Sequence, residues 1–138
     1  MIVDLKLERQ NTIFMPKRYK AYALLGLFIE SLVLTLHNPF FSLLEATSNA
    51  EAILNNIYIP INILCIASCI LLLREKLLGL KMARFALIIL MAILIIDLIF
   101  GISYVELLDY FIGIIEILIY GFFLRYWMKK EHLAFLSN

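Results

Sequence analysis

Four long apolar runs divide this sequence and leave few choices for its fold. They cover about residues 21–36, 57–73, 82–102 and 107–124, and each run is apolar nearly all round rather than along one stripe. In a helix, runs of about 16 to 21 residues approach the ~30 Å hydrocarbon core of a bilayer. The chain of 138 residues is 64% hydrophobic and 17% charged, whereas a soluble domain needs a more polar surface. The sequence therefore predicts an all-α integral membrane protein, a single domain formed by a transmembrane four-helix bundle.

The positions of the twelve Lys and Arg residues predict how these spans are oriented. All of them lie before the first span, in or next to the link between the second and third, or after the fourth, and the other two links contain none. With four spans these three regions share one side, which the positive-inside rule assigns to the cytoplasm. The tails, residues 1–20 and 125–138, are then both cytoplasmic. We expect the protein in a bacterial or archaeal inner membrane.

Tyrosines and the tryptophan stand near the ends of the spans, as in the aromatic belts of membrane proteins. The predicted inner belt is Tyr19, Tyr22, Tyr126 and Trp127, and the predicted outer belt is Tyr58, Tyr104 and Tyr110. His37 and His132 are expected to be an interfacial and a surface residue. Cys65 and Cys69 are one helical turn apart, which suits neither a disulfide nor a zinc site, so they are expected to be small packing residues.

The link between the first two spans is expected to hold a short amphipathic helix on the outer membrane surface. Phe40 and Phe41 are too apolar for a free loop, and Ser48 and Glu51 have capping-box spacing. Pro60 is expected in the first turn of the second span, where proline is tolerated.

Three acidic residues, Glu30, Asp97 and Glu116, lie inside the apolar spans, and no Lys or Arg lies deep enough to pair with them. Each costs up to ~3 kcal/mol near the bilayer centre on insertion scales. Counted from the outer ends of the spans, all three lie ~9 to ~13 Å deep, so they are predicted to form one layer. Gly26, Gly101 and Gly113 share their helix faces, which predicts that the acids face the helix interfaces.

Two further polar residues lie on these faces. Asp109 extends the face of Glu116, and Asn62 lies on the second span three residues before Cys65. Several carboxylates without a cation cannot all stay ionised in a low dielectric, so some are expected to hold protons near neutral pH. Such a site can bind and exchange a proton, a sodium ion or an organic cation. The candidate proton- or cation-binding residues are Glu30, Asp97, Glu116, Asp109 and Asn62.

The predicted function is a proton- or cation-handling transporter or channel subunit. A single bundle of four helices leaves little room for an aqueous pore, so conduction would require a homo-oligomer. The alternative is a non-catalytic interaction protein, an accessory subunit or an immunity- or defence-type protein, whose acids hydrogen-bond between helices or await a partner membrane protein. Enzyme motifs, a cofactor signature and a metal site are not found in the sequence, and nothing favours nucleic-acid binding.

The four-span plan with a glutamate in the first span resembles the small multidrug resistance transporters. The chain departs from that family in its long outer link, in its complete charge asymmetry and in the acids of its third and fourth spans. No role from that family is therefore assigned to Glu30.

Overall fold

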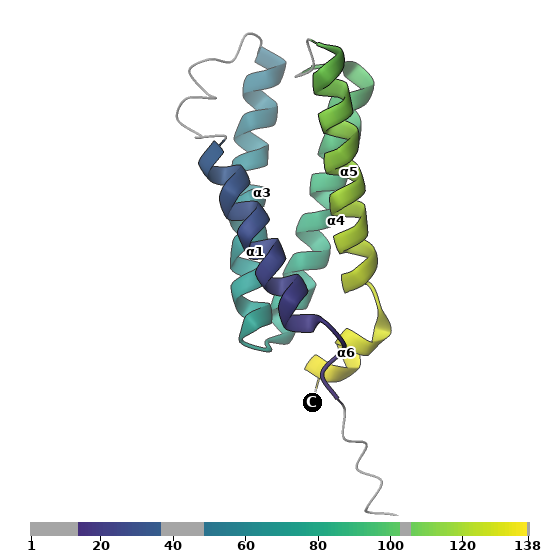
Figure 1. The fold of residues 1–138 in the computed structure, drawn as a ribbon. Coiled ribbons are helices and arrows are strands. Elements are labelled where there is room, and N and C mark those ends of the chain that lie inside the picture. Colours follow the sequence, from purple (N-terminus) through teal and green to yellow (C-terminus); the bar gives the residue numbers. More distant parts are fainter. Residues whose placement is uncertain (1–13, 37–48, 103–105, 138) are drawn as a thin grey trace, which may run out of the picture.

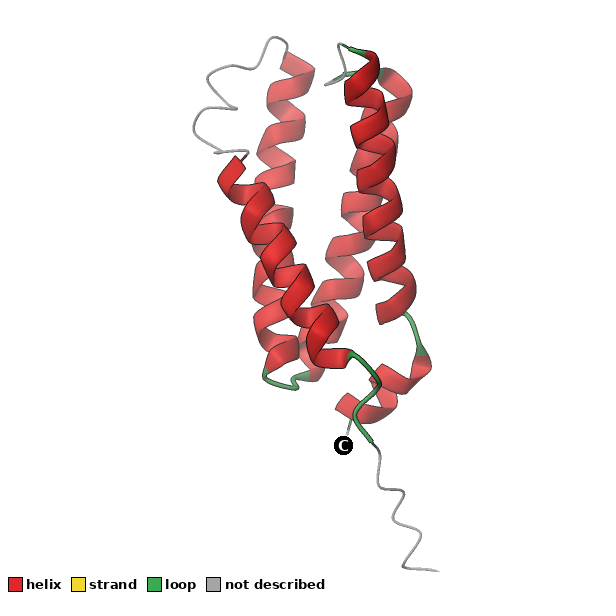
Figure 2. Cartoon of the chain, viewed as in Figure 1, coloured by secondary structure: helices red, strands yellow, loops and turns green. Residues whose placement is uncertain are grey.

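The described part of the chain folds into α-helices. A computed structural model describes residues 14–36, 49–102 and 106–137, and every regular element within these ranges is helical (Figure 2). The helices are α1 (Tyr19–Leu36), α3 (Asn49–Leu73), α4 (Leu77–Phe100), α5 (Leu107–Trp127) and the short α6 (Lys130–Leu136). The prediction of an all-helical chain is confirmed within these ranges.

Helices α3, α4 and α5 are long and apolar enough to cross a membrane. Their outward faces carry large hydrophobic side chains, such as Ile99, Leu107 and Leu118, that are at least two-thirds exposed. A water-soluble surface rarely carries so much exposed apolar area, whereas lipid accepts it without cost. The length and composition of these helices therefore fit an integral membrane protein. Helix α1 is the shortest of the four long helices, with 18 residues.

The four long helices lie side by side, and α6 lies across one end, which we call the α6 end (Figure 1). Helix α3 packs against α1 and α4, and α4 packs against α5 and α6. Helices α1 and α5 meet through aromatic side chains: the rings of Tyr22 and Tyr126 stack with centroids 3.6 Å apart. Aromatic side chains of α1 and α5 therefore contact each other near the α6 end.

The turn between α3 and α4 is tight. Glu75 adopts a left-handed conformation (φ 56°), and the N–H groups of Glu75 and Lys76 donate to the carbonyls of Leu72 and Leu71. This pair of bonds is the Schellman motif that commonly ends helices. Gly79 then lies directly against the end of α3, because a Cβ added there would approach the backbone nitrogen of Leu72 to 2.7 Å.

Three helix boundaries differ from the prediction. Helix α3 begins at Asn49 rather than near residue 57, so Pro60 lies in the helix interior and not in a first turn. Helix α4 begins at Leu77 rather than near residue 82, because long basic side chains can extend from the first turns toward water. It ends at Phe100, because Gly101 adopts φ 60° and its N–H donates to the carbonyl of Asp97. Gly101 is therefore a helix cap and not a helix-packing residue.

The predicted outer helix is described only in part. Residues 49–56 form the first two turns of α3, continuous with the rest of that helix. Residues 40–48, and with them Phe40, Phe41 and Ser48, lie outside the described residues, as do His37 and Tyr104.

Candidate functional site

Glu30 is a buried acid on the inward face of α1. Its side chain is only 3% exposed. Gly26 precedes it by one turn on the same face, and a Cβ added there would meet the Cys69 sulfur at 3.1 Å and the Phe123 ring at 3.5 Å. The small residue thus brings α1 close to α3 and α5, and the next turn carries Glu30 into the interface of the three helices.

A cavity of about 20 Å³ lies beside Glu30. Space of this kind needs roughly 10–15 Å³ to hold one water molecule, so the cavity has room for a single water. Residues of α1, α3, α4 and α5 line it. These residues are Gly26, Ile29, Glu30, Cys65, Ser68, Cys69, Ala83, Leu87, Tyr120, Phe123 and Trp127.

The Glu30 carboxyl is only partly satisfied by hydrogen bonds. The Tyr120 hydroxyl of α5 donates to it, and Tyr120 is in turn hydrogen-bonded to Tyr58 of α3. The second carboxyl oxygen, Oε2, is buried and has no hydrogen-bond partner among the described residues. Buried polar atoms nearly always find a partner, so an open position beside this oxygen indicates a place for a water, a proton or a small cation.

The described residues around Glu30 supply no permanent positive charge. The cavity lining contains no Lys or Arg among the described residues. Ser68 donates its hydroxyl hydrogen to the carbonyl of Cys65, one turn earlier in α3, at 2.7 Å, and Cys65 and Cys69 are free thiols. The cysteines therefore pack as small residues, as predicted, and they also form part of the cavity wall. A carboxylate enclosed in this way must recruit its counter-charge from outside the protein or take up a proton.

The three predicted acids are placed differently. Glu116 lies on α5, is half-buried and interacts electrostatically with Glu30. Nine residues after the start of α5 place it about 13 Å from that end, and six residues before the end of α1 place Glu30 about 9 Å from its end. Asp97 is buried but lies only three residues before the end of α4, about 5 Å from that helix end. Glu30 and Glu116 therefore interact electrostatically, whereas Asp97 lies closer to the end of its own helix, α4.

The two remaining predicted residues have separate positions. Asp109 is the third residue of α5 and accepts a hydrogen bond from the backbone N–H of Glu106 at 2.9 Å, which completes a capping box. Asn62 is 1% exposed and lies on the cavity-facing side of α3, although it does not line the cavity. Its Oδ1 is a second buried oxygen without a hydrogen-bond partner among the described residues.

Tyr58 is predicted to belong to the outer aromatic belt, but the structure places its hydroxyl beside Tyr120 and near Glu30. The signal was present in the spacing, because Tyr58, Asn62, Cys65 and Cys69 recur on one face of a helix. The inner belt differs as well: Tyr19, Tyr126 and Trp127 are at most 6% exposed and pack against one another instead of facing lipid headgroups.

The prediction that His132 lies on the surface is wrong. His132 of α6 is 0% exposed and packs among Tyr19, Tyr126 and Trp127. The sequence offered only a short, weakly amphipathic segment here, and the burial comes from tertiary contacts of α6 across the end of the long helices.

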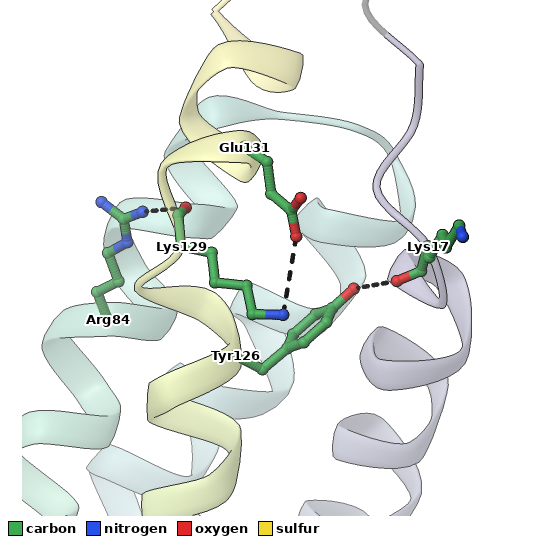
Figure 3. A network of polar contacts seen from close by, with 5 residues as sticks. All are labelled: Lys17, Arg84, Tyr126, Lys129 and Glu131. Carbon is green, nitrogen blue, oxygen red and sulfur yellow. Dashed lines mark hydrogen bonds and ion pairs between the residues drawn. The ribbon is translucent and has the colours of Figure 1, made fainter.

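Figure 3 shows the polar contacts that fix this end of the molecule. The Tyr126 hydroxyl donates to the carbonyl of Lys17 at 2.9 Å, and Arg84 of α4 donates to the carbonyls of Trp127 at 2.9 Å and Lys129 at 3.4 Å. The Tyr19 hydroxyl donates to the carbonyl of Leu72 at 2.8 Å. These bonds join α1, α3, α4 and α5 at the α6 end.

Within the described ranges, no group of three or more His, Cys, Asp or Glu side chains is placed to hold a metal ion. The chain matches no protein-family model, no curated protein and no solved structure.

Proposed function

We propose that the chain is a non-enzymatic, four-span membrane protein that binds and exchanges a proton or a small monovalent cation at Glu30. The observation that carries this proposal is the Glu30 carboxyl itself. It is 3% exposed, one of its oxygens has no hydrogen-bond partner among the described residues, and it borders a cavity with room for one water. Ionisable groups inside a membrane are costly to keep and commonly mark ion or proton pathways.

The proposed topology has four spans and both termini in the cytoplasm. Its support is the distribution of charge along the described helices. The basic residues of the described ranges gather at the α6 end. They lie at the start of α1, in the α3–α4 turn and the first turns of α4, and in or after the last turn of α5, whereas Glu51, Glu106 and Asp109 lie at the opposite end. The positive-inside rule then assigns the α6 end to the cytoplasm. Helix α1, at about 27 Å, would serve as the shortest span.

The size of the cavity narrows the class of ligand. Sites for drug-sized molecules are commonly ~300 to ~1,000 Å³, so about 20 Å³ is far too small for an organic cation. A proton, with or without a water, fits the space, and so does one dehydrated monovalent ion. Tyr120 would hold one carboxyl oxygen in place while Oε2 receives the ligand. Because Glu116 interacts with Glu30, a positive charge taken up by one acid weakens uptake by the other, and this coupling favours exchange over permanent binding.

The test is the melting temperature of the purified protein against pH and against Li⁺, Na⁺ and K⁺, for wild type and Glu30→Gln. A ligand that binds only the folded state stabilises it by about 2.7 kcal/mol at a hundredfold excess over Kd. We expect a stabilising response to acid or to one cation in wild type and its loss in Glu30→Gln. Other titrating groups are common to both proteins, so their contributions cancel in the comparison.

A matched control is Glu75→Gln, which removes an exposed carboxyl from the α3–α4 turn and should keep the wild-type response. If wild type and Glu30→Gln melt alike under every condition, the ion-site proposal fails. Glu30 then serves helix packing or a partner membrane protein, and co-purification in mild detergent becomes the experiment that identifies the partner.

A further inference from the structure

His132 is a fully buried histidine at the α6 end, outside the site of Glu30. Its ring centroid lies 4.5 Å from that of Tyr126, 5.1 Å from that of Trp127 and 6.0 Å from that of Tyr19. Neither ring nitrogen makes a hydrogen bond of full geometry to a described residue, although the backbone of Tyr126 lies within reach of the ring. A neutral imidazole with unsatisfied nitrogens is already costly to bury, and an imidazolium, which carries two N–H donors and a charge, is more so.

The charged groups around His132 come from several elements. Glu131 is its neighbour in α6, Lys129 lies in the turn before α6, and Arg84 reaches over from α4. The phenol groups of Tyr19 and Tyr126 face it from α1 and α5. Burial lowers the pKa of His132 below its ordinary value. Glu131 and the backbone of Tyr126 oppose this lowering, and the positive charges of Lys129 and Arg84 add to it. The ring is therefore neutral at neutral pH.

The indole of Trp127 links this histidine to the cavity of Glu30. It contacts the His132 ring, and it also forms part of the cavity wall. We propose that His132 is a second proton site that acts as a latch: when it is protonated, α6 and Trp127 are released and the Glu30 cavity opens toward the α6 end. The latch does not require that Glu30 binds an ion, so it stands independently of the proposed function.

The sign of the pH dependence follows from the lowered pKa. Burial of neutral His132 contributes stability that is present above its ordinary pKa of about 6.5. That contribution is lost as the pH falls below this value toward the lowered pKa of the folded state, because the open state binds more protons. Acidification therefore favours the released state.

The chain contains a single tryptophan, so its fluorescence reports on the latch directly. On acidification from pH 8 to pH 5 in reconstituted membranes, we expect the emission maximum of Trp127 to shift to longer wavelength and its quenching by acrylamide to rise. In His132→Phe, which fills the aromatic surroundings without a titrating group, neither readout should change. A wild-type emission that does not depend on pH, or the same shift in His132→Phe, would overturn the proposal.

Two exposed residues provide variants that leave the fold intact. Glu131 and Lys129 form a surface ion pair at 3.9 Å, and each side chain is 54% exposed. Glu131→Gln removes the charge that favours the imidazolium, so the midpoint of the fluorescence change should move to lower pH. Lys129→Gln should move it to higher pH. Midpoints that stay unchanged, or that move the same way, contradict a role for His132.

The cavity opening has its own readout, because the two cysteines of the chain both line the cavity. Acidification lowers the thiolate fraction, and with it the rate of thiol labelling, equally in wild type and in His132→Phe. The ratio of the two labelling rates therefore does not depend on this effect. We expect this ratio to rise several-fold on acidification, and also in a Glu30→Gln background. A ratio that stays near one would show that the cavity does not open. Because the readout is the same with or without the Glu30 carboxyl, its failure is distinct from a failure of the ion site.

Discussion

A Gly79→Ala variant is expected to lose about 3 kcal/mol of unfolding free energy, near the upper end of the usual cost of overpacking. The added methyl group would lie 2.7 Å from the backbone nitrogen of Leu72 and 2.8 Å from the Cβ of Leu71. These atoms belong to the end of α3 and cannot rotate away, so the α3–α4 turn must shift as a unit. Denaturant or thermal unfolding in detergent, followed by circular dichroism, measures the loss.

Gly121→Ala is the matched control for this variant. Its added methyl group would meet only the flexible end of Met91, at 3.6 Å, an ordinary van der Waals distance. Alanine is favoured over glycine inside a helix by up to about 1 kcal/mol, so this variant should be neutral or slightly stabilised. Equal losses in both variants would contradict the close approach of α3 and α4 at Gly79.

An Arg84→Met variant is expected to lose about 2 kcal/mol of unfolding free energy. The guanidinium donates to the carbonyl of Trp127, which the end of α5 leaves without a helical partner. It also donates to the carbonyl of Lys129, which accepts the backbone N–H of His132 as well. Hydrogen bonds to charged groups contribute about 1.5 to 3 kcal/mol, and a cation also suits the negative end of the helix dipole. Methionine retains much of the apolar stem, so the loss reports on the charge and the hydrogen bonds.

Lys81→Met is the control, since Lys81 is exposed and lies one turn earlier in α4. Its stability should stay within about 0.5 kcal/mol of wild type, as surface substitutions usually do. An Arg84→Met variant that unfolds like Lys81→Met would show that α5 does not depend on this cap.

The helices were predictable because apolar runs of this length, with no polar stripe, have few possible structures other than a membrane-spanning helix. Their ends were harder to place. The start of α4 was missed because Lys81 marks the end of an apparent basic link, although its side chain can extend from a helical turn toward water. The start of α3 was missed because polar residues around Asn55 resemble a link, yet they belong to one continuous helix with the apolar residues that follow.

The site was predictable only where a periodicity existed. Glu30 and Gly26 share a helix face, as do Asn62, Cys65 and Cys69. The structure buries both sets. Tyr58 and His132 were missed for a different reason. Their surroundings consist of side chains from distant segments, Tyr120 for one and Tyr19 with Trp127 for the other, and a single sequence does not reveal such contacts.

The most direct test of the account is the infrared spectrum of the protein in membranes, recorded for wild type and Glu30→Gln across a pH series. A protonated carboxyl group has a carbonyl stretch that an ionised carboxylate lacks, so the difference between the two proteins isolates Glu30. We expect a band for a protonated carboxyl that is present in wild type, absent in Glu30→Gln, and altered by pH or by the cation that stabilises the fold. A spectrum without that band, or one that is identical in both proteins and indifferent to pH and cations, would contradict the assignment of Glu30 as an exchangeable proton or cation site.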